Sequence, residues 1–131
     1  MTRRPCAQCG LNRAERFYAG PRARKCQTCL KANRSAATHA RRVLTTYGLT
    51  TEQYEALLAH QDGACAICCG SRRYRLNVDH DHSTGLVRGL LCRRCNKLLR
   101  DVRDNALVLG AAARFLQRPP AVELGIRAVA A

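Results

Sequence analysis

Four polar residues in a row, Asp79-His80-Asp81-His82, form the densest group of metal-competent side chains in the chain. Carboxylate oxygens are ligands that Mg²⁺ prefers, and a neutral imidazole can take a proton from water near neutral pH. Asn96 directly follows a cysteine pair and offers an amide oxygen as a second hard ligand. These residue types suit metal-assisted hydrolysis of a phosphodiester bond. A polar turn or a further structural metal site is the alternative interpretation of the same four residues.

Eight of the nine cysteines form four Cys-x-x-Cys pairs. A pair at this spacing places two sulfurs on one side of a tight turn, and two pairs complete a tetrahedral zinc site with no open position for water. A single pair would leave redox chemistry or a disulfide open, but four pairs favour two structural zinc ions. The predicted ligands are Cys6, Cys9, Cys26 and Cys29 for one ion and Cys65, Cys68, Cys92 and Cys95 for the other, with Cys69 as a spectator thiol.

The elements around the polar residues must bring Asn96 toward Asp79. Residues 74–79 alternate polar and apolar side chains and predict a strand, residues 86–91 predict the returning strand, and a helix is expected from about 92 to 100. This ββα unit, with a cysteine pair at each end, would place Asn96 near the end of the first strand. Adjacent strand residues point to opposite faces, so the strand must end or bulge at Asp79 and His80 for both to serve one site.

Three further helices are expected. Residues 33–47 lack Gly and Pro and predict a basic helix with Arg34, Arg41 and Arg42 outward, either a solvated linker or a helix lying along phosphates. Thr50 and Gln53 fit a capping box for the next helix, which Gly63 can close. A last helix, capped by Asp104, should carry Leu107, Ala111 and Phe115 on one face and stop at Pro119-Pro120.

Composition excludes several classes of protein. The chain has 131 residues and a formal net charge of +14, and residues 1–42 hold 11 Lys and Arg against one acid. Such an excess predicts a polyanionic partner, and aromatic residues at 5% predict a small aliphatic core that needs zinc to fold. No apolar run is long enough to span a membrane. The N-terminus does not resemble a secretory signal, so we expect a reducing, cytoplasmic location, which is the bacterial host cytoplasm if the chain is phage-encoded.

The string from Val78 to Asn96 closely resembles the phage recombination endonuclease VII family, which belongs to the HNH, or ββα-metal, nucleases. The preceding segments 47–50, 54–58 and 65–68 are similar to the same family, and the resemblance covers about residues 44–118. Residues 1–32, which contain the first two cysteine pairs, resemble an accessory zinc-ribbon module that precedes such domains in phage proteins. One departure from the family is Asn77, where some relatives carry a further His. Another is the short C-terminal region, since the junction-resolving members use long helices to build an intertwined dimer.

The resemblance implies a role for each matching residue. Asp79 and Asn96 would bind a catalytic Mg²⁺ or Mn²⁺ ion, and His80 would be the general base. Asp81 and His82 would orient groups or assist the leaving oxygen. Arg88 would contact phosphate or brace the hairpin.

The predicted fold is a small zinc-stabilised α+β protein with a ββα-metal core and flanking helices, preceded by a zinc-ribbon-like module. We expect a basic module at 1–32, a linker helix at 33–48, an HNH domain at 49–118 and a tail at 119–131. The predicted function is metal-dependent cleavage of DNA, as nicking or structure-selective cleavage of branched DNA, with Arg34, Arg41 and Arg42 adding backbone affinity. A non-catalytic, zinc-dependent DNA-binding phage protein and an RNA-directed nuclease or toxin are the alternatives, and a homodimer stays open.

Overall fold

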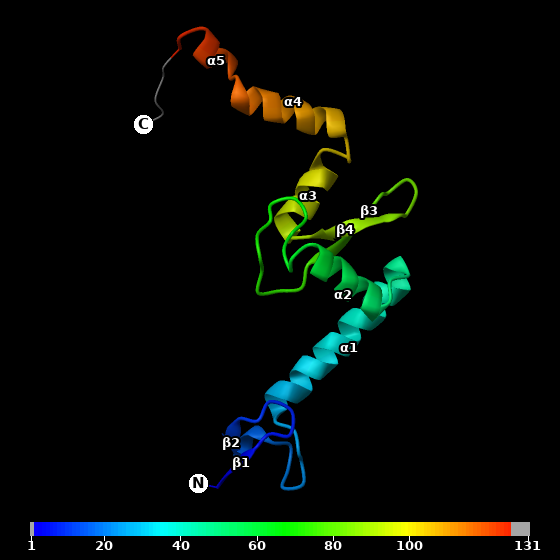
Figure 1. Cartoon of the computed structure of the whole chain (residues 1–131), viewed down its shortest axis with the longest axis vertical. Helices are drawn as coiled ribbons and strands as arrows, with labels where there is room; N and C mark the ends of the chain where they lie inside the picture. The colour runs from blue at the N-terminus through cyan, green and yellow to red at the C-terminus, as the bar shows by residue number, and fades with distance from the viewer. Residues whose placement is uncertain (1, 127–131) are drawn as a thin grey trace. The chain divides into compact units, whose positions relative to one another are not determined.

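The computed structural model describes residues 2–126, and the chain divides into two units, Met1–Glu55 and Ala56–Ala131. Helices and two small antiparallel sheets make it a small α+β protein, as predicted (Figure 1). Within the described residues, no helix combines the length and apolar character needed to span a membrane.

The first unit starts with a short hairpin, β1 (Arg3–Pro5) and β2 (Asn12–Ala14), and a 3-10 turn at Glu15–Phe17. Its core is small and consists largely of cysteine: Cys6, Cys26, Cys29 and Tyr18 are buried together. Arg4 joins β1 to the segment after the hairpin, because its guanidinium lies 4.2 Å from the centre of the Tyr18 ring and donates to the Gly20 carbonyl at 2.7 Å. Tyr18 in turn donates its hydroxyl to the Arg4 carbonyl at 2.8 Å.

Helix α1 (Gln27–Tyr47) begins at the second cysteine pair, and Figure 1 shows it following the β1–β2 hairpin in the chain. The sequence predicted its start at residue 33, and this was wrong. Cys26 is the N-cap and Cys29 lies in the first turn, so the cysteine pair is itself the beginning of the helix. Gly48 ends α1 in the left-handed conformation at φ 69°.

Helix α2 (Thr51–His60) begins with the predicted capping box. The Gln53 N–H donates to the Thr50 hydroxyl at 3.2 Å, and the Thr50 N–H donates to the Gln53 side-chain oxygen at 2.9 Å. Gly63 closes the helix at φ 69° by donating to the Leu58 carbonyl. Tyr54 is buried and meets the ring of His39 on α1 edge to face at 4.8 Å.

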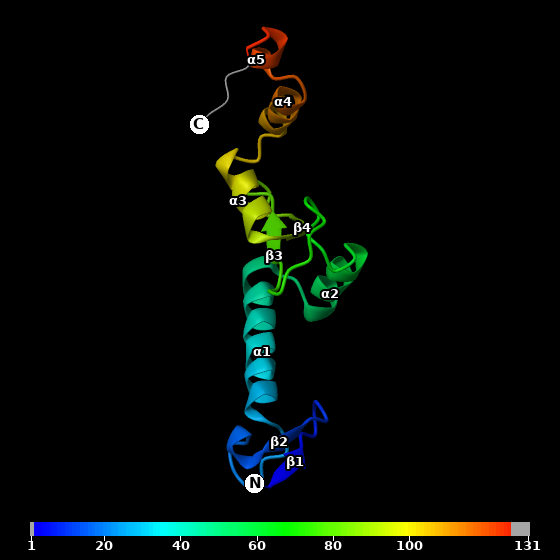
Figure 2. The same ribbon diagram turned by 90° about the vertical axis from the view of Figure 1, so that its left-hand side faces the viewer.

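The second unit contains the hairpin β3 (Asn77–His80) and β4 (Val87–Leu91), followed by helix α3 (Arg93–Asp101). Helix α3 contacts both strands and lies alongside them (Figure 2). The strand predicted from residue 74 starts only at Asn77. Tyr74, before the strand, contacts the start of α3 instead. Its hydroxyl accepts a hydrogen bond from the Arg93 N–H at 3.4 Å, and its ring lies under the Arg93 guanidinium.

Gln61 ties the end of α2 to the buried strand β4. Its side-chain oxygen accepts from the Leu90 N–H at 2.9 Å, and its amide nitrogen donates to the Leu90 carbonyl at 2.8 Å. The amide therefore pairs with Leu90 as a neighbouring strand would. Leu90 is fully buried, so these two backbone groups have no access to water.

Helix α4 (Ala106–Gln117) is capped by Asn105, whose side-chain oxygen accepts from the N–H groups of Leu107 and Val108. The predicted cap, Asp104, was wrong by one residue because its carboxylate is bound elsewhere. The prolines do stop α4, but Pro120 also opens the short helix α5 (Pro120–Glu123), where a proline at the first position costs no hydrogen bond. The predicted tail at 119–131 is described only to residue 126, and residues 127–131 lie outside the described part.

Candidate metal centres and polar site

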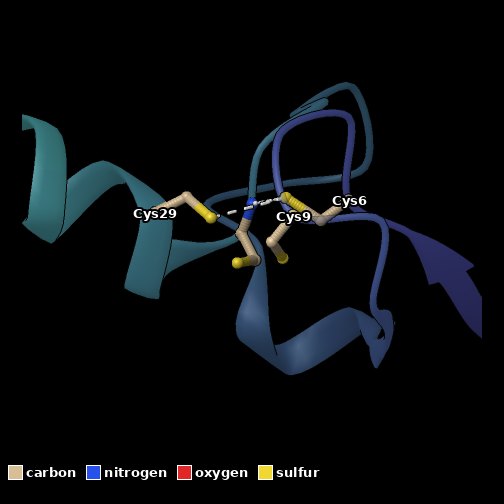
Figure 3. Close-up of side chains that lie close together, drawn as sticks. Cys6, Cys9 and Cys29 are labelled. Carbon is tan, nitrogen blue, oxygen red and sulfur yellow. Dashed lines mark hydrogen bonds between the residues drawn. The ribbon is translucent and has the colours of Figure 1, made fainter.

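The first four-cysteine group draws one pair from the turn after β1 and the other from the start of α1. All four sulfurs lie within 4.8 Å of one another, and the Cys6 and Cys29 sulfurs are 3.8 Å apart (Figure 3). A tetrahedral zinc ion with Zn–S bonds of about 2.3 Å requires sulfurs about 3.8 Å apart, whereas a disulfide requires about 2.05 Å. The geometry therefore fits zinc, as predicted.

Backbone N–H groups point at the sulfurs of this group. Cys6 accepts from the Cys26 N–H at 3.2 Å and from the Gln8 N–H at 3.5 Å, and these bonds lower the pKa of the Cys6 thiol to about 6. Contact with the Cys26 sulfur, together with burial, raises the pKa of Cys29 to about 12. Four thiolates this close repel one another, so complete ionisation needs a cation at their centre.

The second group, Cys65, Cys68, Cys92 and Cys95, has the same construction, and its sulfurs also lie within 4.8 Å of one another. The Cys68 and Cys92 sulfurs are 3.9 Å apart. Cys92 is the N-cap of α3, and a backbone hydrogen bond from Cys95 lowers its pKa to about 6, as expected where helix N–H groups face a thiolate.

Arg72 adds a positive charge beside the second group. Its guanidinium donates to the Cys68 sulfur at 3.5 Å, and its hydrogen bond to Cys92 raises the pKa of Arg72. A Cβ at Gly70 would lie too close to a guanidinium nitrogen of Arg72, so a larger residue there would require this flexible side chain to shift. Cys69 is exposed, has a left-handed φ of 54° and is not part of the group.

The polar residues lie at the turn end of the β3–β4 hairpin, where β3 ends and β4 begins. Asp79 is buried, with 4% of its surface exposed, although it is a carboxylate. The pairing of the strands shifts between Asp79 and His80: Asp79 faces Gly89 and His80 faces Val87, so Arg88 is the extra residue of a bulge. The predicted strand had to end or bulge at this point; β3 does end at His80, and the extra residue lies on its partner β4.

Arg88 compensates the buried charge of Asp79. Its Nε donates to one Asp79 oxygen at 2.7 Å and its Nη2 to the other at 3.1 Å. The same Nη2 donates to Asp104 at 2.8 Å, and the two carboxylates raise the pKa of Arg88, Asp79 having the larger effect. Each carboxylate oxygen has two lone pairs, so this contact leaves Asp79 acceptor capacity for a cation.

Asp104 also holds His82. The His82 Nδ1 lies 2.8 Å from the second Asp104 oxygen, and the His80 and His82 rings are 4.8 Å apart between centres. The hydrogen bond from His82 and, with a smaller effect, the hydrogen bond from Arg88 lower the pKa of Asp104. Sequence reasoning assigned this aspartate to a helix cap and missed it as a site residue.

The remaining predicted residues divide between turn, helix and surface. Asp81 accepts from the N–H groups of Ser83 and Thr84 at 2.8 and 3.0 Å and so builds the hairpin turn. Asn96 is half-buried in the first turn of α3, the helix that contacts β3. On α1, in the first unit, the predicted DNA-binding residues are all exposed: Arg34, Arg41 and Arg42.

The protein thus has two four-cysteine groups suited to structural zinc. Separate from them, a polar site surrounds the buried carboxylate of Asp79 at the hairpin bulge. The model of the recombination endonuclease VII family matches residues 40–118. The chain belongs to this family, as the resemblance predicted.

Two phage proteins are similar over most of the chain. The Gene 59 protein of Mycobacterium phage D29 is 44% identical over 129 residues, covering 93% of this chain and 78% of the relative. The Gene 59 protein of Mycobacterium phage L5 is 40% identical over 129 residues, covering 93% and 79%. No solved structure matches the chain. Family membership indicates a nuclease that acts on DNA, with two four-cysteine groups suited to structural zinc.

Proposed function

We propose that this protein is an HNH endonuclease that hydrolyses phosphodiester bonds in DNA, by nicking or by structure-selective cleavage. In this proposal β3, β4 and α3 form the ββα-metal core. The observation that carries it is the bulge between Asp79 and His80. The extra residue, Arg88, lies on β4, and β3 itself ends at His80. The regular strand pairing is therefore interrupted next to the two residues that must act on one substrate.

Asp79 and Asn96 would hold the catalytic metal ion. Their oxygens are the donors that Mg²⁺ and Mn²⁺ prefer, and they belong to elements that contact each other. When bound, such an ion polarises the scissile phosphate and stabilises the leaving 3′-oxygen. Burial of Asp79 beside Arg88 keeps this carboxylate fixed in place.

His80 would be the general base that takes a proton from the attacking water. His82 would stand beside it, near the leaving oxygen or the phosphate, because the two rings are neighbours. Asp81 supports the site indirectly by building the turn that carries His82. The two zinc ions would be structural, since four thiolates leave no position for water.

The test compares His80→Ala with His60→Ala, a matched histidine exposed in the last turn of α2. Nicking of supercoiled plasmid should fall by about 100-fold or more in His80→Ala, because general acid–base catalysis contributes roughly 10²–10⁴-fold. His60→Ala should cleave at the wild-type rate. Zinc content measured on each protein shows that the variants are folded.

Equal cleavage by His80→Ala and wild type would overturn the assignment of the base. Tight DNA binding without cleavage by any of the three proteins would favour the alternative, a zinc-dependent DNA-binding protein. A parallel reaction with RNA of the same sequence distinguishes the RNA-directed alternative.

A further inference from the structure

We infer that Asp104 is a positioning residue of the polar site, which fixes His82 and Arg88 at once; the inference rests on the proposed nuclease function. Asp104 lies outside the hairpin, between α3 and α4. It is nevertheless the residue that connects one of the two neighbouring histidines to the arginine bound to Asp79.

Each oxygen of the Asp104 carboxylate has its own partner. One lies 2.8 Å from His82 Nδ1 and the other accepts from Arg88 Nη2 at 2.8 Å. A carboxylate can only accept, so the His82 proton is held on Nδ1 and the lone pair of a neutral ring lies on Nε2. Asp104 therefore selects the tautomer and the direction of the His82 ring.

The backbone of Asp104 is shaped for this contact. The end of α3 forms a Schellman motif, in which the Asp104 N–H donates to the Leu99 carbonyl and the Arg103 N–H donates to the Arg100 carbonyl. Arg103 and Asp104 both have left-handed φ values, 53° and 56°. Glycine suits such positions best, but a glycine at 104 would have no carboxylate.

Asp104 also shares Arg88 with Asp79. The Arg88 Nη2 is bound by both carboxylates, so Asp104 fixes the far end of the guanidinium while Nε stays on Asp79. Without Asp104 the guanidinium would be held from one side only. The orientation of Asp79, the proposed metal ligand, thus depends on a residue outside the hairpin that acts through Arg88.

The test compares Asp104→Gly with Arg103→Gly in the zinc-loaded full-length protein. Both substitutions place glycine at a left-handed position, and only the first removes the carboxylate. The first measurement is the tautomer of His82, from nitrogen–proton NMR spectra of the imidazole above neutral pH. We expect the Nδ1–H form in wild type and Arg103→Gly, and loss of that form in Asp104→Gly.

The second measurement is the cleavage rate at saturating DNA with Mg²⁺ or Mn²⁺. The turnover number kcat should fall by about 10- to 100-fold in Asp104→Gly, the usual loss when a supporting contact is removed, while KM changes little. An unchanged His82 tautomer in Asp104→Gly overturns the inference. If the wild type cleaves, an unchanged kcat in Asp104→Gly overturns it as well. A wild type that does not cleave removes the proposed function, and the tautomer result still decides whether Asp104 positions His82.

Discussion

At the scale of single residues, the charged side chains of the polar site are linked in series by ion pairs and hydrogen bonds. Arg88 joins the buried Asp79 to Asp104, and Asp104 joins Arg88 to His82. Removing one partner from a buried ion pair leaves an uncompensated charge, which costs more than the pair contributes. The arrangement therefore makes the position of each side chain depend on the next, and it gives the buried Asp79 a positively charged partner.

Gln61 provides a prediction at this scale that concerns stability alone. Gln61→Ala would remove the side-chain partner of the N–H of the fully buried Leu90, while the Leu90 carbonyl would keep its bond from the Ala66 N–H at 3.2 Å. The free energy of unfolding should fall by about 1–3 kcal/mol, the cost of an unsatisfied buried polar group. Denaturant titration measures it in the zinc-loaded protein.

Gln117→Ala is the matched control, because Gln117 is the exposed last residue of α4. Its unfolding free energy should stay within about 0.5 kcal/mol of wild type. A Gln61→Ala variant as stable as this control would show that water or a rearranged strand replaces the amide.

At the scale of elements, the parts specified by neighbouring residues were predictable. The capping box of α2 and the glycine that ends α1 depend on residues three or four positions apart, and both are present. The spacing of the four cysteine pairs also predicted the two groups of four sulfurs that the structure contains. Local signals could not give the contacts of Asp104, because its partners lie 16 and 22 residues earlier in the chain.

The errors at this scale have the same cause. The start of α1 was predicted six residues late, at 33 rather than 27. A Cys-x-x-Cys pair predicts a tight turn, but here the second pair forms the N-cap and first turn of the helix. The cap of α4 was assigned to Asp104 rather than Asn105 because both residue types favour caps. Only the fold shows that Asp104 is already bound to His82 and Arg88.

Cysteine substitution tests the second metal centre. Cys68→Ser should lower the zinc content by one ion per chain and unfold the β3–β4 region, because both cysteine pairs enclose it. Cys69→Ser, at the neighbouring exposed thiol outside the group, should retain the wild-type zinc content. Metal analysis after gel filtration measures both, and equal zinc loss in the two variants would contradict the assignment of ligands.

At the scale of the whole molecule, positive charge is the dominant feature. The net charge is +14, and the first unit carries most of the excess, with Arg34, Arg41 and Arg42 exposed on α1. In the proposed function, such a surface would bind DNA phosphates without regard to sequence, through release of counterions. The polar site belongs to the second unit, so affinity and chemistry can be separated by substitution.

Replacing Arg34, Arg41 and Arg42 together with alanine should weaken DNA binding and flatten its salt dependence. Each lost phosphate contact lowers the slope of log K against log salt by about 0.9, so the slope should fall by up to about 2.7. Fluorescence anisotropy across a salt titration measures it. Arg118→Ala removes an exposed arginine that is paired with Glu123 and should leave the slope unchanged; an unchanged slope in the triple variant would remove α1 from the DNA interface.

The measurement that tests the central claim most directly is nicking of supercoiled plasmid by the zinc-loaded wild-type protein, with Mg²⁺, with Mn²⁺ and with EDTA. Zinc content is measured before and after, so that loss of the catalytic ion is distinguished from loss of structural zinc. We expect nicked plasmid with either metal and intact plasmid in EDTA, with both zinc ions retained. Intact plasmid in every reaction, with a four-way junction also uncut, would contradict the claim that this protein is a nuclease.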